Sequence, residues 1–153
     1  MYKRKVIVMH LSSLLRSDLI LLSQSVDTKE AAIRILTERI AETHHGLDAE
    51  KVFQKIMERE AVNAAAFPNG VVIPHARIDK FQDLAIAALA PKEPLDSFRI
   101  MFLILTDPVR ANLYLNVLAA ILKFSREAGN LGKLVSAESP RDFIHLLESF
   151  DLT

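Results

Sequence analysis

The stretch PNGVVIPHAR, residues 68–77, holds a histidine that could act as a base, a metal ligand or a nucleophile. A turn signal and a short apolar run precede it, and Pro74 stands directly before His75. Because proline fixes its own φ and removes a backbone donor, we expect Pro74 to end a strand and to hold His75 at the strand tip. Strand tips in open α/β sheets are where ligands usually bind. The alternative is a partly buried histidine whose ring is satisfied by a backbone carbonyl.

Two arginines are candidates for holding an anion beside this histidine. Arg77 follows it by two residues, and Arg59 precedes the loop that leads to it. A histidine that accepts a phosphoryl group carries a dianion, whose oxygens guanidinium groups bind bidentately. At about 4 Å and an effective dielectric constant of about 20, each pair of unit charges is worth roughly 4 kcal/mol before desolvation. Both arginines also fit an ordinary surface role, and the sequence alone does not bring Arg59 close to His75.

Metal and thiol chemistry find little support in the sequence. The chain has no cysteine, and no HExxH or similar spacing surrounds its histidines. His44 and His45 stand beside an expected helix end, where we expect both to be exposed. The sequence therefore predicts no metal site and no cofactor, and a cysteine-free chain suits a reducing cytoplasm.

Length and charge narrow the class of protein further. The 153 residues have the size of one domain, expected to span residues 1–153, and half of them are hydrophobic. Lysine plus arginine and aspartate plus glutamate number 19 each, which argues against nucleic acid as a partner. The short cluster Lys3-Arg4-Lys5 is interpreted as a solvated tail. The charge-free stretch from Ala111 to Leu122 is shorter than the roughly 20 residues of a membrane helix.

Apolar patterns predict the elements that must position these side chains. Strands are expected at residues 19–22, 71–73, 84–89 and 98–105, the last buried on both faces. Helices are expected from residue 28 to near Gly46, at 49–60, at 111–126 and from Ser139 onward, and residues 61–70 are expected to form a loop. Helices that alternate with buried strands indicate a layered α/β domain.

Helix start and stop signals support these ranges. Asp27 with Glu30 reads as a capping box, and Asp48 can cap the second helix. In the third helix Tyr114 shares one face with Val117, Leu118 and Ile121, and Gly129 can close it. Ser139-Pro140-Arg141-Asp142 starts the last helix, whose expected buried stripe consists of Phe143, Leu146, Leu147 and Phe150.

Five segments carry a resemblance to a known family: SVDTKEAAIRIL, KIMEREA, NGVVIPHAR, YLNVLAAILKF and LVSAESPRDFIHLL. The chain resembles the IIA domains of the bacterial phosphoenolpyruvate:sugar phosphotransferase system, in the fructose/mannitol class that includes the nitrogen-regulatory IIA proteins. The resemblance spans about residues 11–150. It implies a mixed β-sheet flanked by helices.

The resemblance also implies a role for individual residues. His75 matches the histidine that takes a phosphoryl group from the phosphocarrier protein HPr or a relative. Arg59 matches an arginine that stabilises this group. For Arg77 the expectation of a second anion contact comes from its place two residues after His75 and not from the resemblance. The partners that it implies are an HPr-type carrier, then a IIB domain or a regulated transporter or kinase.

Two departures from the family pattern leave an alternative open. The family usually has a Ser-Thr-Gly type stretch in the loop, where this chain has Ala64-Ala65-Ala66, and it usually has a second histidine where Tyr114 stands. A phenol can donate a hydrogen bond to a phosphoryl oxygen but carries no positive charge. Tyr114 is therefore either a binding residue or simply part of the buried stripe.

The chain is predicted to be a phosphoryl-accepting IIA protein with a regulatory role, or else a non-enzymatic regulatory or anion- and partner-binding module. Neither sugar choice nor oligomeric state follows from the sequence.

Overall fold

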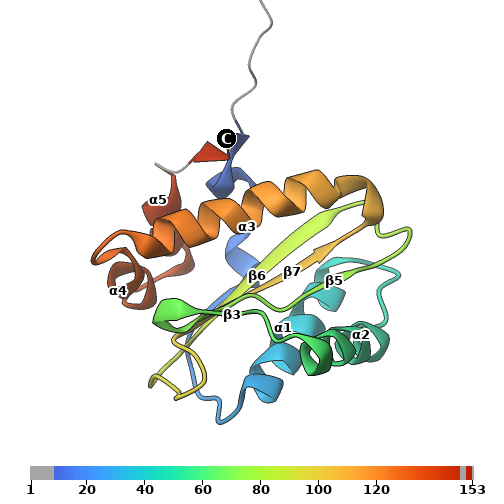
Figure 1. Ribbon diagram of the computed structural model, residues 1–153, viewed down its shortest axis with the longest axis horizontal. Helices are drawn as coiled ribbons and strands as arrows, with labels where there is room; N and C mark the ends of the chain where they lie inside the picture. Colours follow the sequence, from blue (N-terminus) through green and yellow to red (C-terminus); the bar gives the residue numbers. More distant parts are fainter. Residues whose placement is uncertain (1–8, 149–150, 153) are drawn as a thin grey trace, which may run out of the picture.

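Two groups of helices enclose one mixed β-sheet in the computed structural model, which describes residues 9–148 and 151–152 (Figure 1). One face of the sheet is covered by α1 (Lys29–Thr43) and α2 (Ala49–Val62). The other is covered by α3 (Ala111–Arg126), α4 (Asn130–Val135) and α5 (Pro140–Leu147). This arrangement confirms the expected mixed sheet flanked by helices.

The main sheet has six strands in the order β2-β6-β7-β4-β3, with β5 also paired to β7. Their bounds are β2 Ile20–Gln24, β3 Ala66–Phe67, β4 Val71–Val72, β5 His75–Arg77, β6 Leu84–Pro91 and β7 Ile100–Thr106. β6 and β7 run antiparallel, whereas β4 and β5 both run parallel to β7. A separate antiparallel pair joins β1 (Met9–His10) to β8 (Asp151–Leu152). Four short 3₁₀ turns complete the description: η1 Leu11–Leu14, η2 Ser17–Leu19, η3 Pro68–Gly70 and η4 Pro108–Arg110.

The two central strands are buried along their whole length. A buried strand was expected at residues 98–105, and β7 begins two residues later, at Ile100, because Arg99 is exposed. In β7 alternate residues face opposite helix layers: Ile100, Phe102 and Ile104 join the α3 side, and Met101, Leu103 and Leu105 join the α1 side. Alternation with a period of two residues is what a strand between two apolar layers requires. Burying each such side chain stabilises the fold by about 1.5–3 kcal/mol, so β7 gives the strands beside it a firm support.

The predicted helix starts are correct to within one residue. Asp48 accepts hydrogen bonds from the backbone N–H groups of Glu50 and Lys51, and Ser139 accepts one from Asp142. The prediction of Asp27 as first cap is wrong, because the hydroxyl of Thr28 accepts from Ala31 instead. Either side chain can cap a helix, and the pattern alone did not separate neighbours.

Helix ends and short helices were predicted less well. α1 ends at Thr43 instead of near Gly46, and α2 continues two residues beyond Glu60. The third helix has its expected bounds, but Gly129 (φ 83°) lies beyond its end and begins the short α4, which was not predicted. Phe143 and Leu147 are buried as expected. The expectations for Phe150 and for Lys3-Arg4-Lys5 lie outside the described residues.

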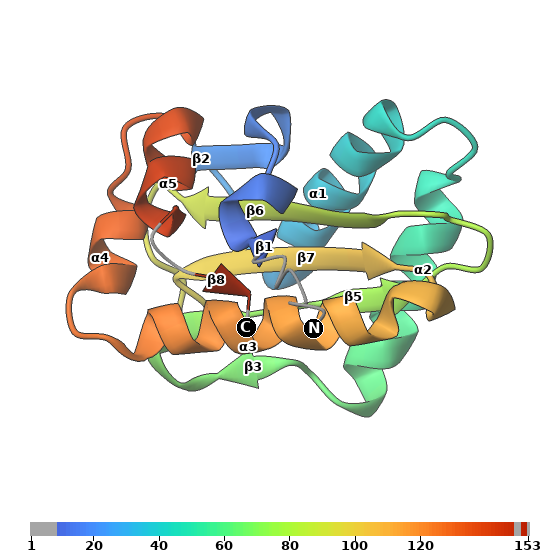
Figure 2. The same cartoon turned by 90° about the horizontal axis from the view of Figure 1, so that it is seen from above.

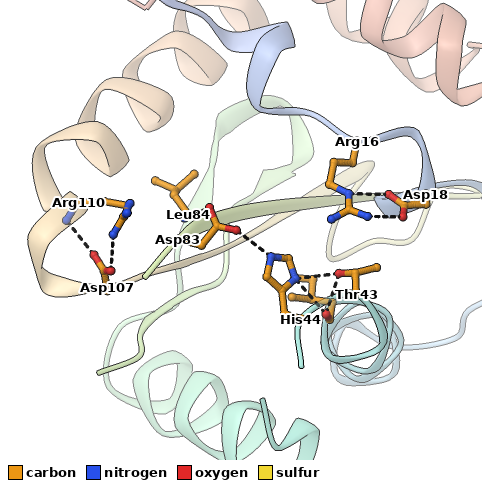
Figure 3. A network of polar contacts seen from close by, with 9 residues as sticks. Arg16, Asp18, Thr43, His44, Asp83, Leu84, Asp107 and Arg110 are labelled. Carbon is orange, nitrogen blue, oxygen red and sulfur yellow. Dashed lines mark hydrogen bonds and ion pairs between the residues drawn. The ribbon is translucent and has the colours of Figure 1, made fainter. Parts of the chain in front are cut away.

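Polar contacts fix the loops that connect these elements (Figure 3). The buried carboxylate of Asp107, at the end of β7, accepts from both the backbone and the guanidinium of Arg110, and so sets the entry into α3. The expectation that His44 is exposed is wrong. Its side chain is 16% exposed, and its Nε2 lies 2.8 Å from the carboxylate of Asp83, which joins the end of α1 to the loop before β6.

Candidate functional site

His75 begins a strand rather than ending one. His75 pairs with Ile104 of β7, and β5 continues to Arg77. Pro74 interrupts the ladder between β4 and β5, because it has no N–H to donate, while its carbonyl accepts from Ile104. The prediction that Pro74 ends a strand is correct, because β4 stops before it. The prediction that His75 lies at the tip of that strand is wrong, because the chain pairs with β7 again from His75 onward.

Both ring nitrogens of His75 have a partner. Nδ1 lies 3.2 Å from the carbonyl oxygen of Ile73, and the Nε–H of Arg59 donates to Nε2 at 2.8 Å. A carbonyl oxygen only accepts, so Nδ1 must carry the proton, and the lone pair of the neutral ring then sits on Nε2. The backbone-carbonyl contact considered in the sequence analysis thus exists, and it leaves the lone pair of the ring on the other nitrogen.

Arg59 reaches this ring from the other side of the sheet. It lies in the last turn of α2, on the helix layer opposite to α3, and its carbonyl accepts from the capping residue Asn63. β5 has β7 as its only partner within the sheet of the described residues, so α2 can reach His75 there. Figure 2 shows the end of α2, β5 and the start of α3 at the same end of the molecule. The tertiary fold supplies the proximity that the sequence could not.

Tyr114 lies against His75 from the first turns of α3. The two ring centroids are 4.9 Å apart, with an angle of 31° between the ring planes. The phenol side chain is buried with the stripe that includes Val117 and Ile121. Both sequence interpretations of Tyr114 therefore describe part of its setting: it packs in the core cluster, and its ring contacts the imidazole.

Arg77 is exposed on the same face of β5 as His75, two residues further along the strand. The structure records no hydrogen bond or ion pair for its guanidinium with another described residue. Burial is the largest cause of both pKa shifts, downward for His75 and upward for Tyr114, and the positive charge of Arg77 acts on both rings by lowering each pKa. Arg59 and Arg77 thus both place positive charge near His75.

Burial is the main cause that lowers the pKa of His75 below its ordinary value, and the charges of Arg59 and Arg77 lower it further. The Ile73 carbonyl and the charge of Glu60 act in the opposite direction. Burial likewise raises the pKa of the Tyr114 hydroxyl. At neutral pH the site therefore holds a neutral imidazole beside a neutral phenol, with arginines supplying the positive charge.

Two residues near the site were not singled out from the sequence. Glu60, next to Arg59, forms an ion pair of 2.6 Å with Lys29 at the start of α1. Glu60 also accepts a hydrogen bond from the backbone N–H of Ala65 in the loop before β3. Nothing in the sequence links Lys29 to Glu60 across 31 positions, although a carboxylate directly beside a candidate arginine was a signal worth weighing.

The described residues offer neither a metal-binding cluster nor a membrane-spanning helix. Within residues 9–148 and 151–152, no three histidine, cysteine, aspartate or glutamate side chains gather where they could bind a metal ion. Over the same residues no helix combines the length and apolarity required to cross a bilayer. The charged groups beside His75 suit an anion.

Known proteins match this chain in sequence. Residues 13–150 match the family described as phosphoenolpyruvate-dependent sugar phosphotransferase system, EIIA 2. The fructose-specific EIIA component of Haloferax volcanii is 25% identical over 139 residues, which cover 86% of this chain and 90% of that protein. The chain spans 14% of the length of two longer curated relatives.

Solved structures share the fold. The nitrogen regulatory protein IIA-Ntr of Neisseria meningitidis aligns with a TM-score of 0.80 and 19% identity, over 90% of this chain and 98% of that one. The mannitol IIA of Escherichia coli, in its complex with phosphorylated IIB, gives 0.66 and 18%, over 88% and 97%. Since the family match covers all but the first 12 and last three residues, the chain belongs to the EIIA 2 family of the phosphoenolpyruvate-dependent sugar phosphotransferase system.

Proposed function

We propose that this protein accepts a phosphoryl group on Nε2 of His75 from an HPr-type phosphocarrier in the cytoplasm. The observation that carries the proposal is the pair of contacts on the imidazole. Ile73 holds the proton on Nδ1, and the guanidinium of Arg59 lies directly at Nε2. A nucleophile with a fixed lone pair and a cation beside it is what transfer of an anionic group requires.

The transfer exchanges one P–N bond for another. The lone pair of Nε2 attacks the phosphorus atom of the carrier's phosphohistidine, and the carrier's imidazole leaves with the electrons of the broken bond. The new phosphoimidazole of His75 keeps its Nδ1 proton and is therefore cationic until that proton leaves. The carbonyl of Ile73 stabilises the Nδ1–H, so the contact that selects the tautomer also supports the product.

Arg59 has two successive tasks in this scheme. Before transfer its Nε–H occupies the lone pair of Nε2, so it must release that nitrogen before the attack. It then lies within reach of the phosphoryl oxygens, which its fork of donors binds bidentately. Arg77, exposed on the same face of β5, adds a second positive charge to hold the product.

Three exposed apolar side chains that lie close in sequence to Arg59 or Tyr114 support a protein as donor. Val62 lies three residues beyond Arg59 on α2, Val109 lies in η4, and Leu115 follows Tyr114 in α3. Their exposed fractions are 89%, 88% and 56%. Apolar side chains beside a charged site favour docking of a folded partner over binding of a small anion alone.

A regulatory purpose is the second part of the proposal. The phosphoryl group on His75 would serve as a signal to a IIB domain, a transporter or a kinase. The similarity to a nitrogen regulatory protein over most of the chain supports this purpose. The alternative, a binding module that does not accept phosphate, draws on Ala64-Ala65-Ala66, which offer no side-chain donor, and on the uncharged Tyr114.

Labelling separates the two functions. The protein is incubated with enzyme I, HPr and labelled phosphoenolpyruvate, beside the variants His75→Ala and His45→Ala. The proposal expects acid-labile label on the wild type and on the His45→Ala control, whose histidine is exposed and distant in sequence from the site. It expects none on His75→Ala. Undiminished label on His75→Ala defeats the assignment, and an unlabelled wild type favours the binding module.

A further inference from the structure

Glu60 sits at the end of α2 with its side chain only 9% exposed, an unusual place for a carboxylate without a task. One oxygen, Oε2, accepts from Lys29 Nζ at 2.6 Å. The other, Oε1, accepts from the backbone N–H of Ala65 at 3.4 Å. The second contact ties the carboxylate to the loop that precedes β3, and that loop leads toward the histidine.

From Ala65 a chain of hydrogen bonds continues to the imidazole. The carbonyl of Ala65 accepts from the N–H of Ile73 at 2.9 Å, and the carbonyl of Ile73 faces Nδ1 of His75 at 3.2 Å. Each of the two residues in this path, Ala65 and Ile73, is held at its N–H by one contact and presents its carbonyl to the next. The position of the Ile73 carbonyl, which selects the tautomer of His75 together with the donor of Arg59, thus depends on where Ala65 is held.

Asn63 is the one polar residue of the loop between α2 and β3, and the structure records no hydrogen bond of its side chain with another described residue. Ala64, Ala65 and Ala66 carry only methyl groups, so a donor or acceptor that anchors the loop must come from elsewhere. We propose that Glu60 is a positioning residue for His75: its carboxylate, held by Lys29, anchors Ala65 and thereby keeps the imidazole lone pair on Nε2. This inference rests on the proposed phosphoryl acceptance at His75 for its effect on rate, although its effect on the tautomer does not.

In the simpler role, the ion pair would only join α1 to α2. The two roles differ in which property of residue 60 matters. Joining α1 to α2 requires the pair of opposite charges, whereas positioning requires a hydrogen-bond acceptor directed at the N–H of Ala65. Replacing both ion-pair partners by neutral side chains of similar size is often tolerated, because it leaves no unpaired buried charge.

Two matched double variants isolate the acceptor. Lys29→Met with Glu60→Gln removes the ion pair but keeps an oxygen at the end of side chain 60. Lys29→Met with Glu60→Met removes both. We measure the ¹⁵N signals of the His75 ring in the unphosphorylated protein, the rate of phosphorylation from HPr, and the thermal midpoint.

The positioning role expects the Gln variant to keep the Nδ1–H tautomer and a rate within about threefold of the wild type. It expects the Met variant to lose the single tautomer and about tenfold or more in rate, since small errors in alignment are costly in catalysis. Equal behaviour of the two variants, in tautomer and in rate, overturns the inference. If the wild type accepts no phosphate, the proposed function fails, and the tautomer alone decides whether Glu60 positions His75.

A second variant serves if the Met pair does not fold. Ala65→Pro removes the N–H that Glu60 accepts while leaving the ion pair with Lys29 in place. The N–H of Ala66 bonds the carbonyl of Ala64 at 3.0 Å, and Ala65 is not among the described residues of positive φ. The turn centred on Ala65 is therefore of the inverse γ type, with a φ near that of proline. Loss of the Nδ1–H tautomer in this variant supports the inference, and an unchanged ring spectrum contradicts it.

Discussion

The ring of Tyr114 lies 4.9 Å from the imidazole of His75, with the two planes tilted by 31°, so the residue that stands where the family resemblance places a second histidine touches the first one. Among the described residues the structure records no hydrogen bond of the Tyr114 hydroxyl. Its contribution to the site as it stands is therefore the face of its ring, which covers one side of the imidazole, and no positive charge.

Replacing Tyr114 tests what that position contributes. Tyr114→His should raise the rate of phosphoryl acceptance by on the order of tenfold, because a protonated second imidazole would share the negative charge and about 1.4 kcal/mol of barrier corresponds to tenfold. Tyr114→Phe keeps the ring contact and should keep most of the rate. The measurement is the initial rate of labelling from HPr at fixed pH. A folded Tyr114→His protein that transfers no faster contradicts the expectation, and a large loss in Tyr114→Phe would mean that the hydroxyl serves the site.

Removing the guanidinium at Nε2 should impair transfer without unfolding the protein. Arg59 is exposed, and exposed substitutions usually change stability by no more than about 0.5 kcal/mol, whereas losing a charge-assisted contact in the transition state costs about 100-fold or more in rate. Arg59→Ala is compared by labelling rate and by denaturant unfolding with Lys55→Ala, an exposed cation one turn earlier on α2. If both variants lose rate equally, Arg59 acts only through the general field of the helix.

Two predictions about pH follow from the lowered pKa of His75. Its pKa is below the ordinary value of 6.5, through burial first and then Arg59. The rate of phosphoryl acceptance should therefore be nearly constant above pH 6.5 and should fall only as the pH drops through the lower folded-state pKa. A rate that already decreases between pH 8 and pH 7 as the pH is lowered would contradict a half-buried nucleophile that is neutral in this range.

The lowered pKa of His75 should also make the stability of the protein depend on pH. Because the unfolded chain binds the proton at the higher pH, the wild type should lose stability relative to His75→Gln as the pH falls from about 6.5 through the folded-state pKa. Chemical denaturation of both proteins from pH 7.5 to pH 4.5 measures the difference. His45→Gln, at an exposed position, provides the control. If the difference in unfolding free energy between the wild type and His75→Gln did not change with pH, the pKa of His75 would not be lowered in the folded state.

The entry to α3 should matter for stability, because it fixes where Tyr114 begins. Asp107 is 4% exposed and caps η4, so Asp107→Ala should destabilise the fold by about 1–2 kcal/mol. Asp107→Asn keeps an acceptor for the Arg110 N–H and should cost less. The exposed pair Arg16–Asp18 provides the comparison in the same view (Figure 3), and Asp18→Ala should change the free energy of unfolding by less than about 1 kcal/mol. Equal losses in Asp107→Ala and Asp18→Ala would contradict the capping role.

Local signals in the sequence predicted the regular elements well. The range of α3 and the burial of β7 follow from long apolar patterns, and two of three helix caps follow from Asp48 and Ser139. The strand β5 was missed because Pro74 looks like a terminus when the partner strand is unknown. The short α4 was missed because six residues give too little periodicity.

Contacts between distant segments were beyond the same reasoning. His75, Ile73 and Pro74 are neighbours in sequence, so the carbonyl contact could be anticipated, whereas Arg59 comes from the opposite helix layer. Only the order of the strands puts β5 where α2 can reach it. The pairing of Lys29 with Glu60 likewise depends on how α1 and α2 pack, which no local pattern specifies.

The most direct test of the central claim is the position of the phosphoryl group on the ring. The protein is phosphorylated by phosphoenolpyruvate, enzyme I and HPr, and the ¹⁵N and ³¹P spectra of the product assign the bonded nitrogen. Since Ile73 holds the proton on Nδ1 and Arg59 lies at Nε2, the account predicts phosphorus bonded to Nε2 of His75. Phosphorus on Nδ1, or on a residue other than His75, would contradict it.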